Sequence, residues 1–343
     1  MTSFDPNAAA DPDAGIFGLP HGPDDAHIHL LPVPFDATTS YGGGASAGPE
    51  AIRSASMQVD LHDHQHGPVY QRGIYMEPPD EDMLSASRQA RALAAGIIER
   101  GGCRPGSGED REAVTRVDAA CERVNGHVES WTRAVLQRGC VPGIIGGDHS
   151  TPFGAIKACA EHAAASGDGF GILQVDAHMD LREAYEDFTW SHASIMWNVL
   201  ERVPEVTRLV QVGIRDYCEA ETKCARRWRE RVNVQYDYDW WRWMDDGASF
   251  RLLCERAVAD LPGQVFISFD INGLSPELCP GTGTPVPGGL SFNQAAALLE
   301  ILQGSGRRVI GFDLNEVCPH EGDGEFNANV GARLLYKLCG ICA

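Results

Sequence analysis

Short apolar runs alternate along the chain with longer segments in which apolar residues recur every three or four positions. The runs are largely apolar throughout, which is typical of strands buried on both faces of a parallel sheet. They predict strands at 141–145, 170–175, 209–212, 265–269 and 309–312. A further short strand is expected to begin near Ile28 and to end at Pro34.

The clearest predicted helix lies between the glycine-rich loop 101–108 and Gly139. Apolar residues follow one another there at spacings of three and four, which form one stripe on a helix. They are Val114, Val117, Cys121, Val124, Val128, Trp131 and Val135. Another helix is expected to begin at Gly48-Pro49-Glu50, because proline is favoured in the first turn. Strands alternating with helices predict an α/β fold: a single three-layer α/β/α domain with a mainly parallel sheet.

The first 25 residues differ from the rest in being rich in Asp, Pro, Ala and Gly without apolar periodicity. We expect residues 1–25 to form a disordered acidic arm, and residues 26–343 to form the domain. The arm has no basic region followed by an apolar run, so no signal peptide is expected. No apolar stretch of about 18 residues occurs, so no membrane partner is expected.

The chain carries 28 Lys and Arg against 48 Asp and Glu, a formal charge of −20. Nucleic acids are bound by neutralising phosphates with clustered cations, and no basic stretch is present, so a nucleic-acid partner is excluded. The 11 cysteines are scattered singly through a large chain. This distribution favours reduced thiols and a cytoplasmic location.

Acidic and imidazole side chains follow three of the predicted strands. The segments are Gly-Gly-Asp-His-Ser at 146–150, Asp-Ala-His-Met-Asp at 176–180 and Ser-Phe-Asp-Ile-Asn-Gly-Leu-Ser-Pro at 268–276. Ligand sites of open α/β sheets lie at such carboxyl ends. In an extended segment the side chains at i and i+2 share a face. Each cluster therefore predicts groups that converge at one edge of the sheet.

The clusters together supply two imidazoles and three carboxylates, from His149, Asp176, His178, Asp180 and Asp270. Without a compensating cation, such carboxylates would repel one another. Mixed nitrogen and oxygen ligands suit Mn²⁺, Ni²⁺, Co²⁺ or Zn²⁺, and bridging carboxylates suit a pair of ions. We therefore expect a site for two divalent cations.

The three segments resemble the metal motifs of the ureohydrolase family, which contains arginases and agmatinases. The resemblance continues through 281–285, 311–317 and 329–333 and covers nearly the whole chain from about residue 28. It implies an arginase-like fold and hydrolysis of a guanidino C–N bond by water that two metal ions activate to hydroxide.

The resemblance also implies a role for each matching residue. Asp176 and Asp270 would bridge the two ions, His149 and Asp180 would complete one metal site, and His178 would belong to the other. Asp180 would also orient the attacking hydroxide. Thr284 and Glu316 would hold the substrate guanidinium. His192 would help to transfer a proton to the leaving amine.

The third motif departs from the family pattern at two positions, where Asn272 and Ser275 replace acidic residues. An asparagine carbonyl can bind a metal ion but brings no charge, so the site shared with His178 is expected to be weakened. Two hypotheses follow. The chain is either an active hydrolase with one weakened metal site, or a catalytically weak or silent partner of an active paralogue.

Other segments look most like the nickel-dependent guanidine hydrolase branch of the family, which is similar to heteromeric biguanide hydrolases such as metformin hydrolase. They are 37–44, 185–196 and 213–218. The resemblance implies a small guanidine or biguanide substrate. It also implies trimers or hexamers, made of this chain alone or with a paralogous subunit. Between Ni²⁺ and Mn²⁺ the sequence leaves the choice open, since both ions accept imidazole and carboxylate.

Three further features have structural as well as functional interpretations. The histidines at 62, 64 and 66 are expected to lie in a solvated or packed loop, with a metal site as the alternative. Trp240, Trp241 and Trp243 would either wedge between a helix and the sheet or form an aromatic contact with a cation or a subunit. Arg215 and Asp216 are expected to form a structural or intersubunit ion pair rather than to contact the substrate.

Overall fold

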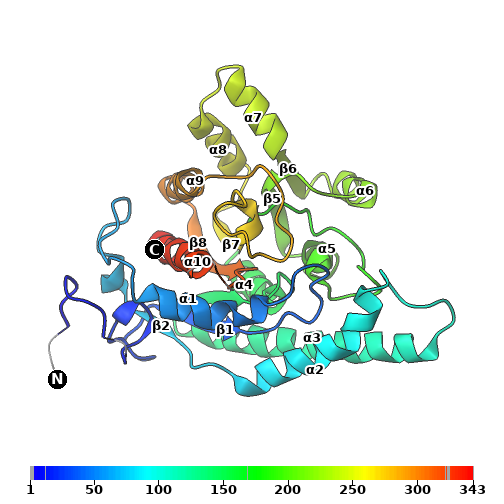
Figure 1. Ribbon diagram of the computed structural model, residues 1–343. Helices are drawn as coiled ribbons and strands as arrows, with labels where there is room; N and C mark the ends of the chain where they lie inside the picture. The colour runs from blue at the N-terminus through cyan, green and yellow to red at the C-terminus, as the bar shows by residue number, and fades with distance from the viewer. Residues whose placement is uncertain (1–3, 12, 168, 321, 323–324, 343) are drawn as a thin grey trace.

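An eight-stranded sheet forms the centre of the molecule in the computed structural model, which describes residues 4–11, 13–167, 169–320, 322 and 325–342 (Figure 1). The strand order is β2-β1-β3-β8-β7-β4-β5-β6, and every pairing between these strands is parallel. The strands are β1 (Ile28–Val33), β2 (Ile74–Met76), β3 (Val141–Gly146), β4 (Phe170–Val175), β5 (Val206–Ile214), β6 (Val232–Tyr236), β7 (Gln264–Asp270) and β8 (Arg308–Asn315). The predicted fold class is confirmed.

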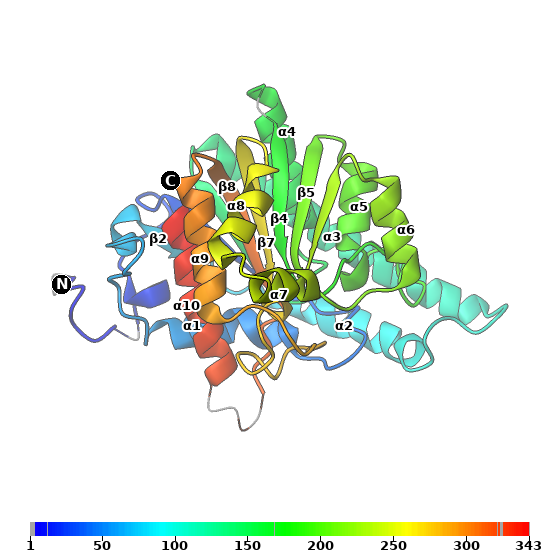
Figure 2. The same ribbon diagram turned by 90° about the horizontal axis from the view of Figure 1, so that it is seen from above.

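Helices cover both faces of the sheet, and each face has its own apolar core (Figure 2). One core includes residues from α1 (Gly48–Ser56), α7 (Asp237–Asp245), α8 (Phe250–Ala259), α9 (Phe292–Gly304) and α10 (Phe326–Ile341). The other includes residues from α2 (Glu81–Ile98), α3 (Gly108–Gln137), α4 (Phe153–Ala165) and α5 (Ile195–Arg202). The short α6 (Glu219–Arg227) packs at the edge of the second core. Among the described helices, none has the length and apolar character needed to span a bilayer.

The predicted strands are present, and most extend by a few residues beyond their predicted ends. Strands β3, β4 and β7 are buried along their whole length, as expected for strands covered on both faces. The prediction missed β6, which lies at one edge of the sheet, where only Val232 is fully buried. A half-exposed edge strand alternates apolar and polar residues, so it lacks the continuous apolar run used for prediction.

The predicted long helix is α3, and Ser107 caps its first turn. The Oγ atom of Ser107 accepts the backbone N–H of Asp110 at 3.1 Å, which satisfies an unpaired donor in the first turn. The helix ends before Gly139, which adopts a left-handed conformation with φ of 74°. Helix α2 was not predicted, since small residues such as Ala90 and Ala94 make up much of its buried stripe.

The segment before β1 is anchored at one point, which differs from the expected disordered arm. Ile16, Phe17 and Leu19 are buried in the core on the α1 and α10 face. The Phe17 ring lies 4.9 Å from the Tyr336 ring of α10, and its backbone N–H donates to Ser56 Oγ at 2.9 Å. Burial of these apolar side chains offsets the entropy that a mobile segment would keep. The composition of residues 1–25 concealed this short apolar group.

The sheet order brings the three predicted motifs side by side. Strands β3, β8, β7 and β4 are consecutive neighbours, although β3 and β8 are far apart in the sequence. The loop after β3 passes very close to the end of β1: a Cβ atom added at Gly147 would overlap the Phe35 carbonyl. Only glycine permits this approach. The motifs thus meet at the carboxyl edge of the central strands.

Candidate active site

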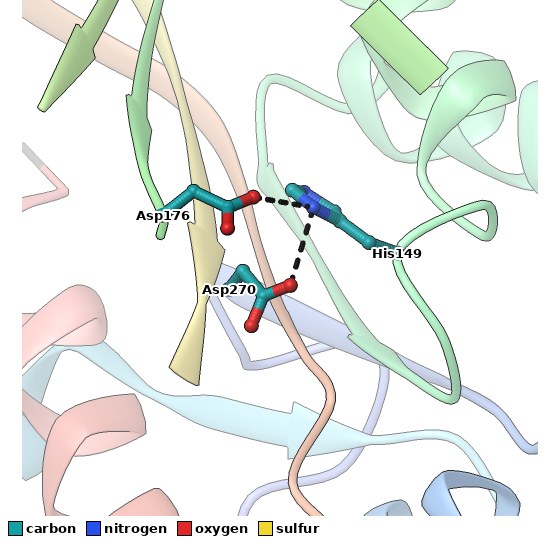
Figure 3. Close-up of side chains that lie close together, drawn as sticks. All are labelled: His149, Asp176 and Asp270. Atoms are coloured by element: carbon teal, nitrogen blue, oxygen red, sulfur yellow. Dashed lines mark ion pairs between the residues drawn. The ribbon is translucent and has the colours of Figure 1, made fainter. Parts of the chain in front are cut away.

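One imidazole nitrogen and three carboxylates converge at this edge. Nδ1 of His149 lies 3.0 Å from Oδ2 of Asp176, 2.9 Å from Oδ2 of Asp180 and 3.5 Å from Oδ2 of Asp270. Figure 3 shows Asp176 and Asp270 pointing toward the His149 ring from neighbouring strand ends. All four side chains are buried. Four of the predicted site residues therefore meet around one point.

The opposite side of the His149 ring contacts a serine. Nε2 of His149 lies 2.9 Å from Oγ of Ser268. In the neutral tautomer that carries its proton on Nε2, the ring donates this proton to Oγ of Ser268. The Nδ1 lone pair of the neutral ring then faces the three carboxylates.

This arrangement fits a divalent cation. Nδ1 of His149 and Oδ2 of Asp180 make no hydrogen bond of acceptable geometry, although both atoms are buried. Acceptors that converge without a proton between them require a positive charge. Within the described residues, the group that meets the spacing expected for metal ligands is His149, Asp176 and Asp270. Imidazole nitrogen and carboxylate oxygen are ligands that Mn²⁺ and Ni²⁺ accept.

The closely spaced carboxylates also shift the pKa values of the site residues. Burial disfavours a charged His149 ring, but Asp176 and Asp180 outweigh burial and raise its pKa well above the ordinary value. Burial and the charge of Asp176 raise the pKa of Asp180 to about 7. The same two causes raise the pKa of Asp270 well above its usual range. Protons therefore substitute for cations where no metal ion neutralises the carboxylates.

Two acidic residues of the site have strained backbones. Asp180 and Glu316 adopt left-handed conformations, with φ of 53° and 63°. Non-glycine residues in this region cost of the order of 1 kcal/mol each and are often found at functional sites. Glu316 follows β8; its Oε1 accepts the backbone N–H of His149 at 2.9 Å, and its buried Oε2 has no hydrogen-bond partner among the described residues. Burial and the charge of Asp148 raise the pKa of Glu316.

A cavity of about 520 Å³ adjoins the carboxylates. Of the predicted site residues, His178, Asp180, His192 and Thr284 line it. Nδ1 of His178 lies 3.4 Å from Oδ1 of Asp176, the carboxylate oxygen that does not face His149. Asp176 thus lies between the two histidines.

His192 lies on the wall of the same cavity. Its Nε2 lies 3.3 Å from Oγ of Ser40, and its Nδ1 lies 3.3 Å from Oγ of Ser191. Burial, with the nearby His178, lowers the pKa of His192 to about 3. The ring is therefore neutral at neutral pH, so it can relay a proton but does not hold an extra one.

The predicted weak position, Asn272, lies beside this cavity with both ends of its amide bonded. Oδ1 accepts the Thr282 hydroxyl at 2.6 Å, and Nδ2 donates to Oγ1 of Thr284 at 3.0 Å. Ser275, the second departure from the family pattern, donates its hydroxyl to the exposed Glu277. Neither residue adds negative charge to the site.

Several residues that support the site were not predicted. Ser268 and Gln174 each precede a site carboxylate by two positions, and Gln174 Nε2 donates to Oδ2 of Asp176 at 2.9 Å. The period of two along a strand was the signal that could have identified them. Among the residues that the structure describes, Arg215 forms no ion pair within this chain; its guanidinium donates to carbonyls of Gly213, Asn272, Leu274, Val286 and Pro287.

The histidine loop and the tryptophan segment both make contacts within the chain. Nδ1 of His66 lies 3.0 Å from Oε1 of Gln303, and the loop around it is held by an ion pair between Asp63 and Lys337. Trp240 is buried and its Nε1 donates to Gln235, whereas Trp241 is 56% exposed. Trp240 is therefore packed inside the protein, as one of the two interpretations expects.

Comparisons with known proteins agree with the site. Residues 26–340 match the model of the Arginase family. The chain is 31% identical over 322 residues to N(1)-aminopropylagmatine ureohydrolase of Synechocystis sp., which covers 92% of this chain and 89% of that protein. It is 30% identical over 308 residues to the mitochondrial agmatinase of Gallus gallus, with 89% and 78% covered.

The fold is also similar to a solved structure, the proclavaminate amidinohydrolase from Streptomyces clavuligerus. The TM-score is 0.70 at 21% sequence identity, and the match covers 97% of this chain and 98% of that one. The whole domain is therefore shared, with its central parallel sheet. The chain belongs to the arginase family, whose ureohydrolases hydrolyse guanidino C–N bonds.

Proposed function

We propose that this chain hydrolyses a C–N bond of a small guanidine or biguanide, a metformin-type compound included. Water adds to the guanidino carbon, the C–N bond breaks, and the leaving nitrogen takes a proton; the products are urea or a urea derivative and an amine. The observation that carries the proposal is the convergence of His149 Nδ1 with three carboxylates beside a cavity that His178 and His192 also line.

Two divalent cations, Ni²⁺ or Mn²⁺, fit the donors of the site. The full-strength position would use His149, Asp176, Asp180 and Asp270, and the weaker one would use His178, Asp176 and Asp270. When bound, such ions supply Lewis acidity and make water nucleophilic at neutral pH. The second position is weaker because Asn272 brings no charge and its amide is already bonded at both ends.

The chain's own residues would bind and orient the reactants. Asp180 lines the cavity, and its buried Oδ2 can accept a hydrogen bond from water and orient it. Glu316 offers a buried oxygen without a partner, which can accept a guanidinium N–H. Thr284 offers a hydroxyl on the cavity wall. The neutral His192 would relay a proton to the leaving nitrogen.

The cavity wall carries charges of both signs. Arg182 lines the cavity, with its guanidinium 4.5 Å from the centre of the Tyr185 ring and its Nε 3.6 Å from Oε2 of Glu221, and Asp180 and Asp216 also line it. The excess of carboxylates suits a cationic guanidino group.

A second candidate function is that of a catalytically weak partner subunit. The uncharged Asn272 and Ser275 favour it, because both replace acidic residues of the third motif and Asn272 brings no charge to the weaker metal position. Exposed aromatic residues offer a surface for a subunit contact: Tyr238 and Trp241 stack 5.7 Å apart and are 67% and 56% exposed. A trimer or hexamer of this chain, alone or with an active paralogue, would cover such a surface.

The experiment is to express the chain alone, to count metal ions per chain and to assay urea and amine release. Guanidine, metformin and agmatine are tested with added Ni²⁺ or Mn²⁺. The matched control is Asp176→Asn, which keeps the shape of a central ligand but removes its charge. We expect turnover of guanidine or metformin by the wild type, little turnover of agmatine, and a loss of metal and activity in the control.

The outcomes separate the two functions. Robust turnover by the isolated chain would exclude the silent-subunit role. Activity that requires co-expression with a paralogue would support that role, and size-exclusion chromatography with light scattering would then show a mixed oligomer. Agmatine turnover well above that of guanidine and metformin would contradict the proposed substrate class.

A further inference from the structure

A row of buried polar residues crosses the sheet next to the candidate active site. Gln211 on β5 is paired in register with Gln174 on β4, and Gln174 is paired with Ser268 on β7. Ser268 is paired in turn with Asp313 on β8. All four side chains are fully buried. An amide in such a place costs free energy unless its polar atoms are hydrogen-bonded.

Backbone carbonyls fix the orientation of both glutamine amides. Nε2 of Gln211 lies 2.7 Å from the carbonyl oxygen of Met179 and 2.6 Å from Oε1 of Gln174. Nε2 of Gln174 lies 3.4 Å from the carbonyl oxygen of His178. A backbone carbonyl can only accept, so the N–H₂ group of each glutamine must face it. Turning either amide over would bring two acceptor oxygens together.

The Gln174 amide also faces a site carboxylate. Its Nε2 donates to Oδ2 of Asp176 at 2.9 Å, and this oxygen also faces Nδ1 of His149. The other oxygen of Asp176, Oδ1, accepts the backbone N–H of His178 at 2.8 Å. Each oxygen of the carboxylate therefore accepts one N–H and keeps a lone pair. The carboxylate is held from both sides while both oxygens remain able to bind a cation.

The Gln211 amide supports the backbone that carries Asp180. The Met179 carbonyl that accepts from Gln211 directly precedes Asp180, which has a left-handed conformation with φ of 53°. The carbonyl of Asp180 in turn accepts the backbone N–H groups of Met196 and Trp197, each at 3.1 Å. A strained conformation persists only where the surrounding structure holds it. Gln211 is one of the groups that hold this one.

We propose that Gln174 and Gln211 are positioning residues, which act in series to hold Asp176 in place for a cation. Gln211 orients the amide of Gln174, and Gln174 orients the carboxylate of Asp176. The inference rests on the proposed function in taking Asp176 as a metal ligand. It goes further by assigning part of the metal affinity to two amides that touch neither an ion nor the substrate.

The test compares metal affinity with stability in the full-length chain. Affinity for Mn²⁺ and for Ni²⁺ is measured by competition with a chelator, and the free energy of unfolding by urea titration. Gln174→Met and Gln211→Met each remove an amide at similar side-chain volume. The matched control is Gln264→Met. Gln264 is only 2% exposed and begins β7, at the end of the strand opposite Asp270.

Neighbours that orient a metal ligand typically contribute about 10- to 100-fold to metal affinity. We therefore expect Gln174→Met to weaken metal binding by at least about 10-fold, and Gln211→Met to weaken it less. The double variant should lose less affinity than the two single losses multiplied together, because Gln211 acts partly through Gln174. Gln264→Met should keep the affinity of the wild type, whatever its change in unfolding free energy.

Unchanged metal affinity in a folded Gln174→Met chain would overturn the inference. If that variant does not fold, unchanged affinity in Gln211→Met would do so. An equal loss of affinity in Gln264→Met would also overturn it, since affinity would then follow stability alone.

Urea release from guanidine and metformin, followed in the same samples, separates this inference from the proposed function. The expected pattern of affinities without urea release by the wild type would support the inference and contradict the hydrolase proposal. Urea release with equal affinities in all variants would do the reverse. A wild type that binds neither ion would contradict both.

Discussion

Ser268 holds the ring of His149 from behind, with 2.9 Å between Oγ of the serine and Nε2 of the imidazole. Neighbours that orient a metal-binding histidine typically contribute about 10- to 100-fold to metal affinity. Ser268→Ala should therefore weaken metal binding by about that factor, as measured by competition with a chelator. Ser130→Ala on the exposed side of α3 is the control. Unchanged affinity in a folded Ser268→Ala chain would show that the ring orients without this contact.

Removing the Asp270 carboxylate should raise the thermal stability of the metal-free protein but reduce the stability that metal binding adds. Asp270 lies within 3.5 Å of His149 Nδ1 in a group of acceptors. Asp270→Asn relieves repulsion, so the metal-free variant should melt at a higher temperature than the metal-free wild type. The wild type should gain about 2.7 kcal/mol from metal at 100 times the dissociation constant, and the variant should gain much less.

The measurement is thermal unfolding with EDTA or with added Mn²⁺ or Ni²⁺. Asp245→Asn, which changes an exposed carboxylate of α7, should behave as the wild type under both conditions. A metal-induced rise in melting temperature that survives in Asp270→Asn would contradict the assignment of Asp270 as a ligand.

Two glycine-to-alanine changes should shift stability in opposite directions. A Cβ at Gly147 would overlap the Phe35 carbonyl, so Gly147→Ala must displace the loop that carries His149. We expect a loss of about 1–3 kcal/mol in the free energy of unfolding, together with weaker metal binding. Gly126 lies within α3 with no atom near its Cβ position. Gly126→Ala should add about 0.5–1 kcal/mol.

Both changes are measured by urea unfolding. A neutral or stabilising Gly147→Ala would mean that the β3 loop moves at little cost. A destabilising Gly126→Ala would mean that another part of the molecule packs against the exposed face of α3.

The chain should become less stable below about pH 6.5, in part because of His66. Burial lowers the pKa of His66, which also faces Asp63, Lys337 and Arg72. A lowered histidine pKa means that the folded state prefers the neutral ring. Its contribution is therefore full above the unfolded pKa of 6.5 and is lost as the pH falls toward the folded value.

The check is the change in unfolding free energy between about pH 7.5 and pH 5.5. His66→Gln keeps a donor for Gln303 but cannot titrate, so the change should be smaller than in the wild type. His62→Gln alters an exposed histidine of the same loop and should leave the change as it is. Equal changes in the wild type and His66→Gln would rule out a contribution from this ring.

The fold could be predicted mainly where a buried element appears in the sequence as a continuous run or regular spacing of apolar residues. Strands β4 and β7 are apolar along their length, so their runs marked them clearly. The edge strands β2 and β6 were missed, since one has three residues and the other is half exposed. The anchoring of Phe17 was missed because it depends on Tyr336, which is distant in the sequence.

The candidate site, like the fold, could be predicted only in part. The positions of His149, Asp176 and Asp270 at strand ends followed from the sequence, and the structure brings them together. Their exact partners did not, because Ser268 and Thr282 act through hydrogen bonds between segments that only the fold makes neighbours. A local pattern predicts where a side chain lies along its own strand, but not which residue faces it.

The place of β8 has a consequence for how the protein is made. This strand, which ends at Asn315, is the last of the sheet to be synthesised, yet it lies between β3 and β7 at the centre. A nascent chain without it cannot place His149 beside Asp270. The expected metal ligands therefore cannot gather until the polypeptide has been synthesised beyond Asn315. Metal ions would then be acquired after the sheet has formed and could not guide the folding of the earlier strands.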